Sequence, residues 1–400
     1  MSFVSERVRR IKLSPSVAAR AIIAQLREEG RRVIDLTIGE PDFLTPEFIR
    51  EAAKAAMDRG ETKYPPAQGT APLRRAIRAR MLEDTGQDYP VNQIIVSTGA
   101  KQVIFNALAA TLNDGDEVII PAPFWVSYPD MVIVNGGKPV IVSATPETDY
   151  KLTPEALEAA ITPATKWVLM NSPSNPTGAI YSRDDWARLT AVLARHPHVW
   201  LMTDDIYARL NFTDTATVHP LQVEPALAAR TLAINGVSKA YAMTGWRIGY
   251  GAGPDELIKA MAIVQSQSTS GASSVGQAAA LAALTGDQSC VKIFADRFRE
   301  RRDAAVAALQ QVPELKVVVP EGAFYVFPDC SALLGKKTPA GDVIATDTDF
   351  TNYLLREAGV AVIDGHAYGA PGTFRLSFAA ALEDIAAGCE SIRAACAKLV

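Results

Sequence analysis

A lysine and an arginine in one glycine-rich run are the residues of this chain best suited to chemistry. Lys239 lies in the run Asn235–Gly249, between a short apolar segment and a turn, and Arg247 follows it by eight residues. A lysine amine in such a place can form a Schiff base with an aldehyde cofactor. An arginine guanidinium can neutralise a phosphate group in a fixed, forked geometry. The run therefore suggests carbonyl chemistry, for which the rest of the chain must supply other groups.

Composition narrows the possible functions. The 400 residues suit two domains, one of them large. The net charge of -4 gives no broad basic field, which argues against a nucleic-acid partner. The sequence has no apolar run near 18 residues and no signal-peptide core at its start, so we expect no membrane span and a cytoplasmic protein. Its four cysteines and four histidines are scattered, so no metal site is predicted.

Short β-branched runs alternate with helical patterns over the first three quarters of the chain. The predicted strands are Ile94–Ser97, Glu117–Ile120, Val140–Val142, Lys166–Met170, Val199–Thr203, Thr231–Ile234 and Arg247–Gly251. This alternation predicts right-handed crossovers and an α/β fold, with a mixed, mostly parallel seven-stranded sheet flanked by helices. Continuous apolar strands such as Val199–Thr203 fit a sheet that is buried on both faces.

The pattern changes after about residue 290. The elements predicted there are a charged helix at Val291–Gln311, strands near Lys316–Val319 and Phe324–Phe327, a helix at Asp347–Ala358, strands near Val360–Ile363 and Thr373–Phe378, and a final helix. They form a smaller α+β unit. Proline-rich punctuation near Gly39–Pro46 suggests that the N-terminal segment docks away from the large sheet. We therefore expect a large domain at 46–289 and a small domain built from 1–45 and 290–400.

Polar residues follow several predicted strands, at the edge where open α/β sheets bind ligands. Gly99, Ala100 and Lys101 open a helix after the first strand, where backbone N–H groups can hold a phosphate, although a plain turn is the alternative. Trp125 follows the next strand and either stacks on a flat cofactor or belongs to the core. Asn175 lies in an irregular turn, where it either donates into the cleft or only supports the turn.

A carboxylate ends the most apolar strand. Burying the Asp204 carboxylate there would cost free energy unless it is paired, and a protonated ring nitrogen would be a suitable partner. A helix N-cap is the competing explanation. Tyr207, three residues later, could hydrogen-bond the same ring. Five successive loops thus offer a phosphate cradle, an aromatic ring, an amide, a carboxylate and an amine. Separate structural roles for each residue, such as a turn or a helix cap, do not explain why all five occur together.

Taken together, these residues resemble the class I aminotransferases, pyridoxal-phosphate enzymes of fold type I, and among them the bacterial aspartate (aspartate/prephenate) branch. The resemblance covers nearly the whole chain. Its motifs are Gly39–Phe43, Lys63–Tyr64, Ser97–Lys101, Pro123–Tyr128, Asn171–Gly178, Asp204–Tyr207, Ser238–Lys239, Gly245–Arg247, Glu321–Tyr325 and Phe374–Ser377.

The resemblance implies a role for each cofactor residue. Lys239 would hold pyridoxal phosphate as an internal aldimine and later move the proton in ping-pong transamination. Asp204 would keep the ring nitrogen protonated, Tyr207 and Asn175 would bind the ring's phenolic oxygen, and Trp125 would stack on the ring. The phosphate would be held by Arg247, Ser238 and the Gly99–Lys101 backbone.

The resemblance also implies substrate contacts and a partner. Arg375 would grip the substrate α-carboxylate, with Gly39, Trp125 and Asn175 beside it. Tyr64 would reach the phosphate of a neighbouring subunit, which implies a homodimer with shared active sites. Two proline bonds are expected to be cis, Ala122–Pro123 and Asn175–Pro176.

Substrate choice is less well defined than reaction type. Lys12, Ser16 and Lys101 could contact a second carboxylate, but Lys12 could equally be a solvated surface charge. The chain departs from the branch's usual pattern at Leu13, Pro15, Leu44, Gly271 and Ala272. An amino-group exchange between aspartate and 2-oxoglutarate, with prephenate/arogenate as a further pair, is the first expectation. An aromatic or neutral amino acid transaminase and a pyridoxal-phosphate lyase remain alternatives.

Overall fold

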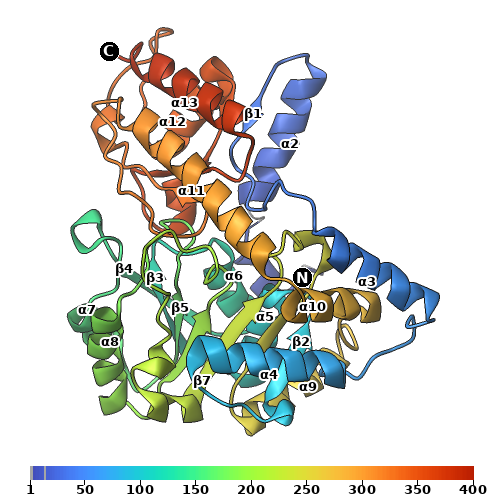
Figure 1. Cartoon of the computed structure of the whole chain (residues 1–400). Coiled ribbons are helices and arrows are strands. Elements are labelled where there is room, and N and C mark those ends of the chain that lie inside the picture. Colours follow the sequence, from blue (N-terminus) through green and yellow to red (C-terminus); the bar gives the residue numbers. More distant parts are fainter. Residues whose placement is uncertain (1–2, 13–14) are drawn as a thin grey trace.

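A seven-stranded sheet forms the centre of the larger part of the molecule (Figure 1). The computed structural model describes residues 3–12 and 15–400, without the side chains of 15–18 and 20. The strands are β2 (Ile94–Ser97), β3 (Glu117–Ala122), β4 (Lys138–Ser143), β5 (Thr165–Asn171), β6 (Trp200–Asp204), β7 (Thr231–Gly236) and β8 (Gly249–Ala252), in the spatial order β2-β8-β7-β6-β5-β3-β4. Strand β8 runs in the opposite direction to the other six strands, so the predicted mixed, mostly parallel sheet is confirmed.

Helices cover both faces of this sheet. One face packs against α3 (Glu47–Asp58), α4 (Ala71–Thr85), α7 (Pro154–Ala160), α8 (Arg183–Arg195) and α10 (Ser274–Thr285). The other face packs against α5 (Ala100–Thr111), α6 (Ser127–Val134) and α9 (Asp255–Ser266). Alternate residues of one strand point into the two cores, as with Val168 and Leu169 of β5. This explains why the strands read as continuous apolar runs.

A smaller unit holds the C-terminal residues. Its elements are α11 (Ser289–Leu309), β9 (Tyr325–Val326), α12 (Asp347–Tyr353), which continues as a π-helical turn (Leu354–Ala358), β10 (Val360–Ala361), β11 (Ile363–Asp364), β12 (Phe374–Ser377) and α13 (Leu382–Cys396). The strands β11, β12 and β9 form a three-stranded antiparallel sheet. The strand expected near Lys316–Val319 is wrong: only Lys316 makes an isolated bridge, to Asp329.

The N-terminal residues form α1 (Glu6–Arg9), α2 (Pro15–Glu28) and β1 (Ile34–Asp35). Helix α1 contacts α6 of the sheet unit, whereas β1 pairs in parallel with β10 of the smaller unit. Figure 1 shows α2, in blue, next to the orange and red C-terminal elements. We propose the division into a large domain at 46–289 and a small domain at 1–45 and 290–400, which places a boundary at the start of α11. Within the described residues, no helix could cross a membrane.

Candidate active site

The site lies at the edge of the sheet where the parallel strands end. Asp204 ends β6, and Lys239 follows β7 by three residues. Because β8 runs antiparallel, its start lies at this same edge, with Gly249 opposite Gly236, and Arg247 comes just before it. A pocket of about 450 Å³ opens here. It contains eleven residues expected from the sequence: Gly39, Ala100, Lys101, Trp125, Asn175, Asp204, Tyr207, Ser238, Lys239, Arg247 and Arg375.

Asp204 has one occupied and one free carboxylate oxygen. The Tyr128 hydroxyl donates to Oδ2 at 2.6 Å, while the buried Oδ1 has no hydrogen-bond partner among the described residues. Burial raises the pKa of Asp204 to about 6, against the lowering effect of the Tyr128 hydrogen bond. Asp204 does not act as a helix N-cap, because no helix begins behind it. A buried acceptor without a donor fits a ligand that brings its own N–H.

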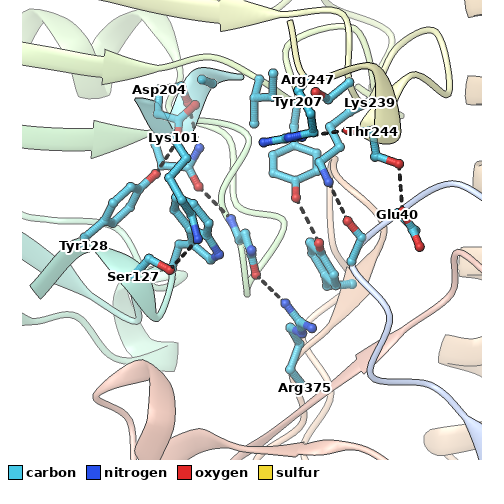
Figure 2. A pocket seen from close by; sticks show the side chains of 18 residues that line it. Glu40, Lys101, Ser127, Tyr128, Asp204, Tyr207, Lys239, Thr244, Arg247 and Arg375 are labelled. Atoms are coloured by element: carbon cyan, nitrogen blue, oxygen red, sulfur yellow. Dashed lines mark hydrogen bonds between the residues drawn. The ribbon is translucent and has the colours of Figure 1, made fainter. Parts of the chain in front are cut away.

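Lys239 lies across the pocket from this carboxylate (Figure 2). Its Nζ donates to the Gly39 carbonyl oxygen. Burial lowers the pKa of its amine to about 8, while the Glu40 carboxylate raises it and the guanidinium of Arg247 lowers it. An amine with such a pKa is partly neutral near pH 7, as a nucleophile or a base must be.

Two glycines and a guanidinium shape the phosphate end of the pocket. A Cβ on Gly99, whose φ is +88°, would lie 2.5 Å from Arg247 Nη2. A Cβ on Gly249 would lie 2.1 Å from the Ala100 backbone nitrogen, so only glycine lets β8 approach the start of α5. The free N–H groups at the start of α5 and the Arg247 side chain therefore lie together. This is a suitable cradle for a phosphate dianion.

The small unit contributes Arg375 from β12. Its side chain is 3% exposed, and it donates to Asn175 Oδ1 at 3.0 Å and to the Thr37 carbonyl oxygen at 2.7 Å. The guanidinium also lies 4.3 Å from the centre of the Tyr325 ring. A buried, forked cation at the pocket wall is the group that best binds a carboxylate.

Two hydroxyls and an amide already have partners inside the pocket. Tyr207 and Tyr325 share a hydrogen bond between their hydroxyls, at 2.9 Å. Asn171 connects the loops: its Nδ2 donates to the Asp204 carbonyl at 2.6 Å, and its Oδ1 accepts from the Asn175 backbone N–H at 2.8 Å. Tyr207 and Asn175 therefore line the pocket as expected and are positioned by neighbours that sequence reasoning did not assign.

Lys101 and Trp125 form the wall opposite these hydroxyls. The Lys101 Nζ donates to Ser127 Oγ at 3.1 Å and lies 4.6 Å from the centre of the Trp125 ring. Burial, and then the charge of Arg247, lowers the pKa of Lys101. Its ammonium is available to a second anionic group in the pocket.

Three expected site residues do not line the pocket of this chain. Gly99 acts through its backbone beside Arg247. Tyr64 is 92% exposed on the surface. Lys12 is also exposed, and its backbone N–H bonds the Asp130 carboxylate. Leu13 and the side chains of Pro15 and Ser16 lie outside the described residues.

The remaining departures lie away from the catalytic groups. Leu44 is 80% exposed, and Ala272 is buried. Gly271 has a φ of +142° and packs beside Pro65–Ala67, the loop that follows Tyr64. The cis bonds expected at Ala122–Pro123 and Asn175–Pro176 are confirmed, and Ser172–Pro173 is cis as well.

Sequence reasoning gave no role to several lining residues: Glu40, Ser127, Tyr128, Asn171, Ile206, Thr244 and Tyr325. Tyr128, Asn171 and Tyr325 stand inside the family motifs, which was the available signal. Glu40 accepts a hydrogen bond from Thr244 Oγ1 at 2.7 Å, across two segments about 200 residues apart. Only the folded chain reveals that contact.

Comparison with known proteins identifies the family. A model of the class I and II aminotransferases matches residues 31–392. The chain belongs to this family. The aminotransferase is 52% identical over 399 residues to the aspartate/prephenate aminotransferase of Cereibacter sphaeroides, with all of both chains covered. It is 51% identical to a probable aspartate/prephenate aminotransferase of Rhizobium leguminosarum bv. phaseoli, with 99% of each chain covered.

A solved structure confirms the fold. The aminotransferase superimposes on the crystal structure of the aspartate aminotransferase from Rhizobium meliloti with a TM-score of 0.97, 50% identity and full coverage of both chains. The Thermus thermophilus aspartate aminotransferase crystallised with maleate gives a TM-score of 0.91 at 40% identity, covering 99% of this chain and all of the other. Enzymes of this family use pyridoxal phosphate.

The Tyr128 hydrogen bond gives a first prediction. Changing Tyr128 to Phe removes the donor that lowers the pKa of Asp204, so this pKa rises by about one unit from about 6. Asp204 is then about half neutral at pH 7, so cofactor affinity falls about twofold at that pH and about eightfold at pH 5.5. Binding titrations from pH 5.5 to 8.5 measure the change. Tyr353→Phe, which removes a buried hydroxyl bonded to Ala395, is the matched control; equal affinities for the two variants would contradict the role of Tyr128.

The Lys239 amine gives a pH prediction for loading the cofactor-free protein. The neutral amine is the nucleophile, and its pKa is about 8. The loading rate should therefore rise about tenfold per pH unit below pH 8 and level off above it. Stopped-flow absorbance with pyridoxal phosphate between pH 6 and 10 measures this profile. A rate that keeps rising to pH 10 would mean that the lysine retains an ordinary pKa.

Proposed function

We propose that this aminotransferase binds pyridoxal phosphate through Lys239 and exchanges the amino group of aspartate with 2-oxoglutarate. The observation that carries the proposal is the buried Oδ1 of Asp204, which has no hydrogen-bond partner among the described residues, in a carboxylate that lines the pocket shared with Lys239 and Arg247. A pyridinium nitrogen supplies the missing donor, and the Gly99–Arg247 cradle suits the phosphate at the other end. The residues present therefore fit the cofactor that the family uses.

Each residue then has a mechanistic task. Pyridoxal phosphate, when bound, supplies an aldehyde and an electron-withdrawing ring. Asp204 holds the proton on the ring nitrogen, and Trp125 covers a ring face. Arg375 binds the substrate α-carboxylate and orients its Cα–H bond toward Lys239. The Lys239 amine would take the proton from Cα and return it at the aldehyde carbon of the cofactor, on the far side of the amino nitrogen, as a base with a lowered pKa can do near neutral pH.

The ammonium group of Lys101 can bind a second carboxylate of the substrate. This ammonium lies beside Trp125, on the wall of the pocket. This supports a dicarboxylic substrate, and the names of the two relatives point to aspartate and also to prephenate. We propose prephenate as a second amino acceptor on that basis. Lys12, exposed here, would have to approach the pocket to take part, and we propose it only as a contact of the bound substrate.

A substrate panel tests this assignment. The loaded enzyme is mixed separately with aspartate, glutamate, arogenate, phenylalanine and alanine, and conversion of cofactor absorbance is followed. Aspartate and glutamate should convert it fastest, arogenate should follow, and alanine should be at least about tenfold slower because it leaves Lys101 without a partner. Faster conversion by phenylalanine than by aspartate would favour an aromatic transaminase. Loss of the amino acid without a 2-oxo acid product would favour a lyase.

We propose that the active enzyme is a homodimer with shared sites. Tyr64 is 92% exposed, and its loop is held firmly: Gln265 Nε2 donates to the Ala67 carbonyl, and the Thr70 N–H donates to Gln277 Oε1 at 2.8 Å. An exposed aromatic on a fixed loop suits insertion into a neighbouring subunit. There its hydroxyl would bond the phosphate held by Arg247.

Subunit mixing tests this arrangement. Tyr64→Ala and Arg247→Ala dimers should each be impaired. After random exchange half the dimers are hybrids, and each hybrid has one intact site, so activity should recover to about one quarter of wild type. Mixtures of Tyr64→Ala with Tyr64→Phe are the control, because both variants lack the Tyr64 hydroxyl and no hybrid site regains it. No recovery in confirmed hybrids would contradict shared sites.

A further inference from the structure

A second carboxylate stands directly behind Asp204. Asp205 is the next residue in the chain and lines a separate cavity of about 590 Å³, together with His219, Asp84 and Arg209. Asp204 lines the active-site pocket instead. The end of β6 thus places one acid on each side of the wall between the two cavities.

His219 and Thr203 hold the Asp205 carboxylate. Thr203 Oγ1 donates to Asp205 Oδ2 at 2.8 Å. The His219 Nε2 lies 3.0 Å from Thr203 Oγ1 and 3.4 Å from Asp205 Oδ2. The histidine is 5% exposed, so its ring has a fixed environment. The three side chains form one closed group beneath the cofactor pocket.

The backbone decides which nitrogen of His219 carries the proton. Leu221 N–H donates to His219 Nδ1 at 3.2 Å, so Nδ1 is an acceptor and carries no hydrogen. The proton is then on Nε2, facing Thr203 and Asp205. The histidine therefore donates from Nε2 to Thr203 Oγ1, which in turn donates to Asp205 Oδ2.

The two arginines that line this cavity, Arg183 and Arg209, make their printed hydrogen bonds to groups other than Asp205; Arg183 donates to the Gln222 carbonyl oxygen at 3.3 Å. Arg209 donates to Asp84 Oδ1 and lies 3.8 Å from Glu83. The charge of Asp205 acts on its surroundings: it contributes to the raised pKa values of Asp84 and Tyr89, after burial. It also contributes to the raised pKa of Asp204. A negative charge that favours a proton on Asp204 equally favours one on a ring nitrogen bound to Asp204.

We propose that Asp205 and His219 are positioning residues of the transamination site: His219, through Thr203, holds the Asp205 carboxylate behind Asp204, and the negative charge of that carboxylate strengthens the hold of the site on the ring-nitrogen proton. The proposal rests on the proposed cofactor role of Asp204. Asp205 and His219 touch neither cofactor nor substrate, and they act through Asp204. The chemistry they favour is the electron withdrawal that the protonated ring provides.

The direct test observes the ring nitrogen itself. The enzyme is loaded with pyridoxal phosphate labelled with ¹⁵N in the ring, and the nitrogen shift is followed by solid-state NMR across pH. Asp205→Asn keeps the size and an acceptor oxygen but removes the charge, so the proton affinity of the ring nitrogen should fall about tenfold, one pH unit. Asp214→Asn removes a carboxylate from the same cavity, outside the group with Thr203 and His219, and should titrate as wild type.

Variants of His219 separate charge from packing. His219→Gln offers an amide donor for Thr203 and should stay close to wild type, whereas His219→Phe should shift in the direction of Asp205→Asn. If Asp205→Asn titrated as wild type, or if Asp205→Asn and Asp214→Asn shifted equally, the role of Asp205 would be refuted while the proposed function would stand. If the unaltered enzyme bound no labelled cofactor, or bound it with an unprotonated ring, the proposed function would fall with it.

Discussion

Replacing Lys239 by alanine should abolish the visible absorbance of the lysine-linked cofactor and slow transamination by at least about 10⁴-fold. The side chain has two tasks, as the covalent anchor and as the base at Cα. Among the described residues that line the pocket, the other lysine is Lys101, which is bonded to Ser127 and lies over Trp125. Spectra of the loaded variant and single-turnover rates with aspartate measure the effect.

The matched control is a lysine on the surface of the same sheet unit. Lys259 on α9 is exposed and pairs with Asp255. Lys259→Ala should keep both the absorbance and the rate within about twofold of wild type, because an exposed ion pair contributes little. Persistence of the lysine-linked band in Lys239→Ala would refute the assignment of this lysine.

Asp204→Asn should give the second large loss. The amide has nearly the same shape and can still accept the Tyr128 hydrogen bond, but it carries no charge to hold a proton on the ring nitrogen. We expect kcat for aspartate and 2-oxoglutarate to fall about 10²–10³-fold, the scale of a lost preorganised electrostatic contact. Because the phosphate cradle at Gly99 and Arg247 is untouched, the variant should still bind the cofactor.

Steady-state kinetics over pH 6–9 measure this loss. Asp88→Asn, which breaks an exposed ion pair with Arg78, is the control and should keep wild-type rates. A variant Asp204→Asn with more than about a tenth of wild-type kcat would show that ring protonation does not depend on this carboxylate.

The residues at strand ends were predictable from the sequence because the sheet places them by a general rule. Asp204 and Lys239 each follow an apolar run, and parallel strands bring such positions to one edge. Arg247 reaches this edge because it lies just before β8, and an antiparallel strand begins at the edge where the parallel strands end. Arg375 came only from the family resemblance, because nothing local shows that β12 faces a pocket in the other unit.

Contacts between distant segments were not predictable. Tyr128 reads as a core aromatic, and only the folded chain brings its hydroxyl, from the start of α6, to Asp204 at the end of β6. His219 reads as an isolated histidine, and its tautomer depends on the backbone turn at Leu221. The false strand at Lys316–Val319 has the right side chains but lacks a neighbouring backbone to pair with, and Pro320 follows it at once.

We propose that Lys239, Asp204 and Arg375 form a site that transaminates aspartate on pyridoxal phosphate. A single half-reaction tests this most directly: the loaded enzyme is mixed with aspartate alone, and cofactor absorbance and oxaloacetate are measured together. We expect the lysine-linked band to disappear while about one oxaloacetate forms per site, as a group-transfer step without turnover requires. An unchanged spectrum with aspartate, alongside conversion by an aromatic amino acid, would contradict it.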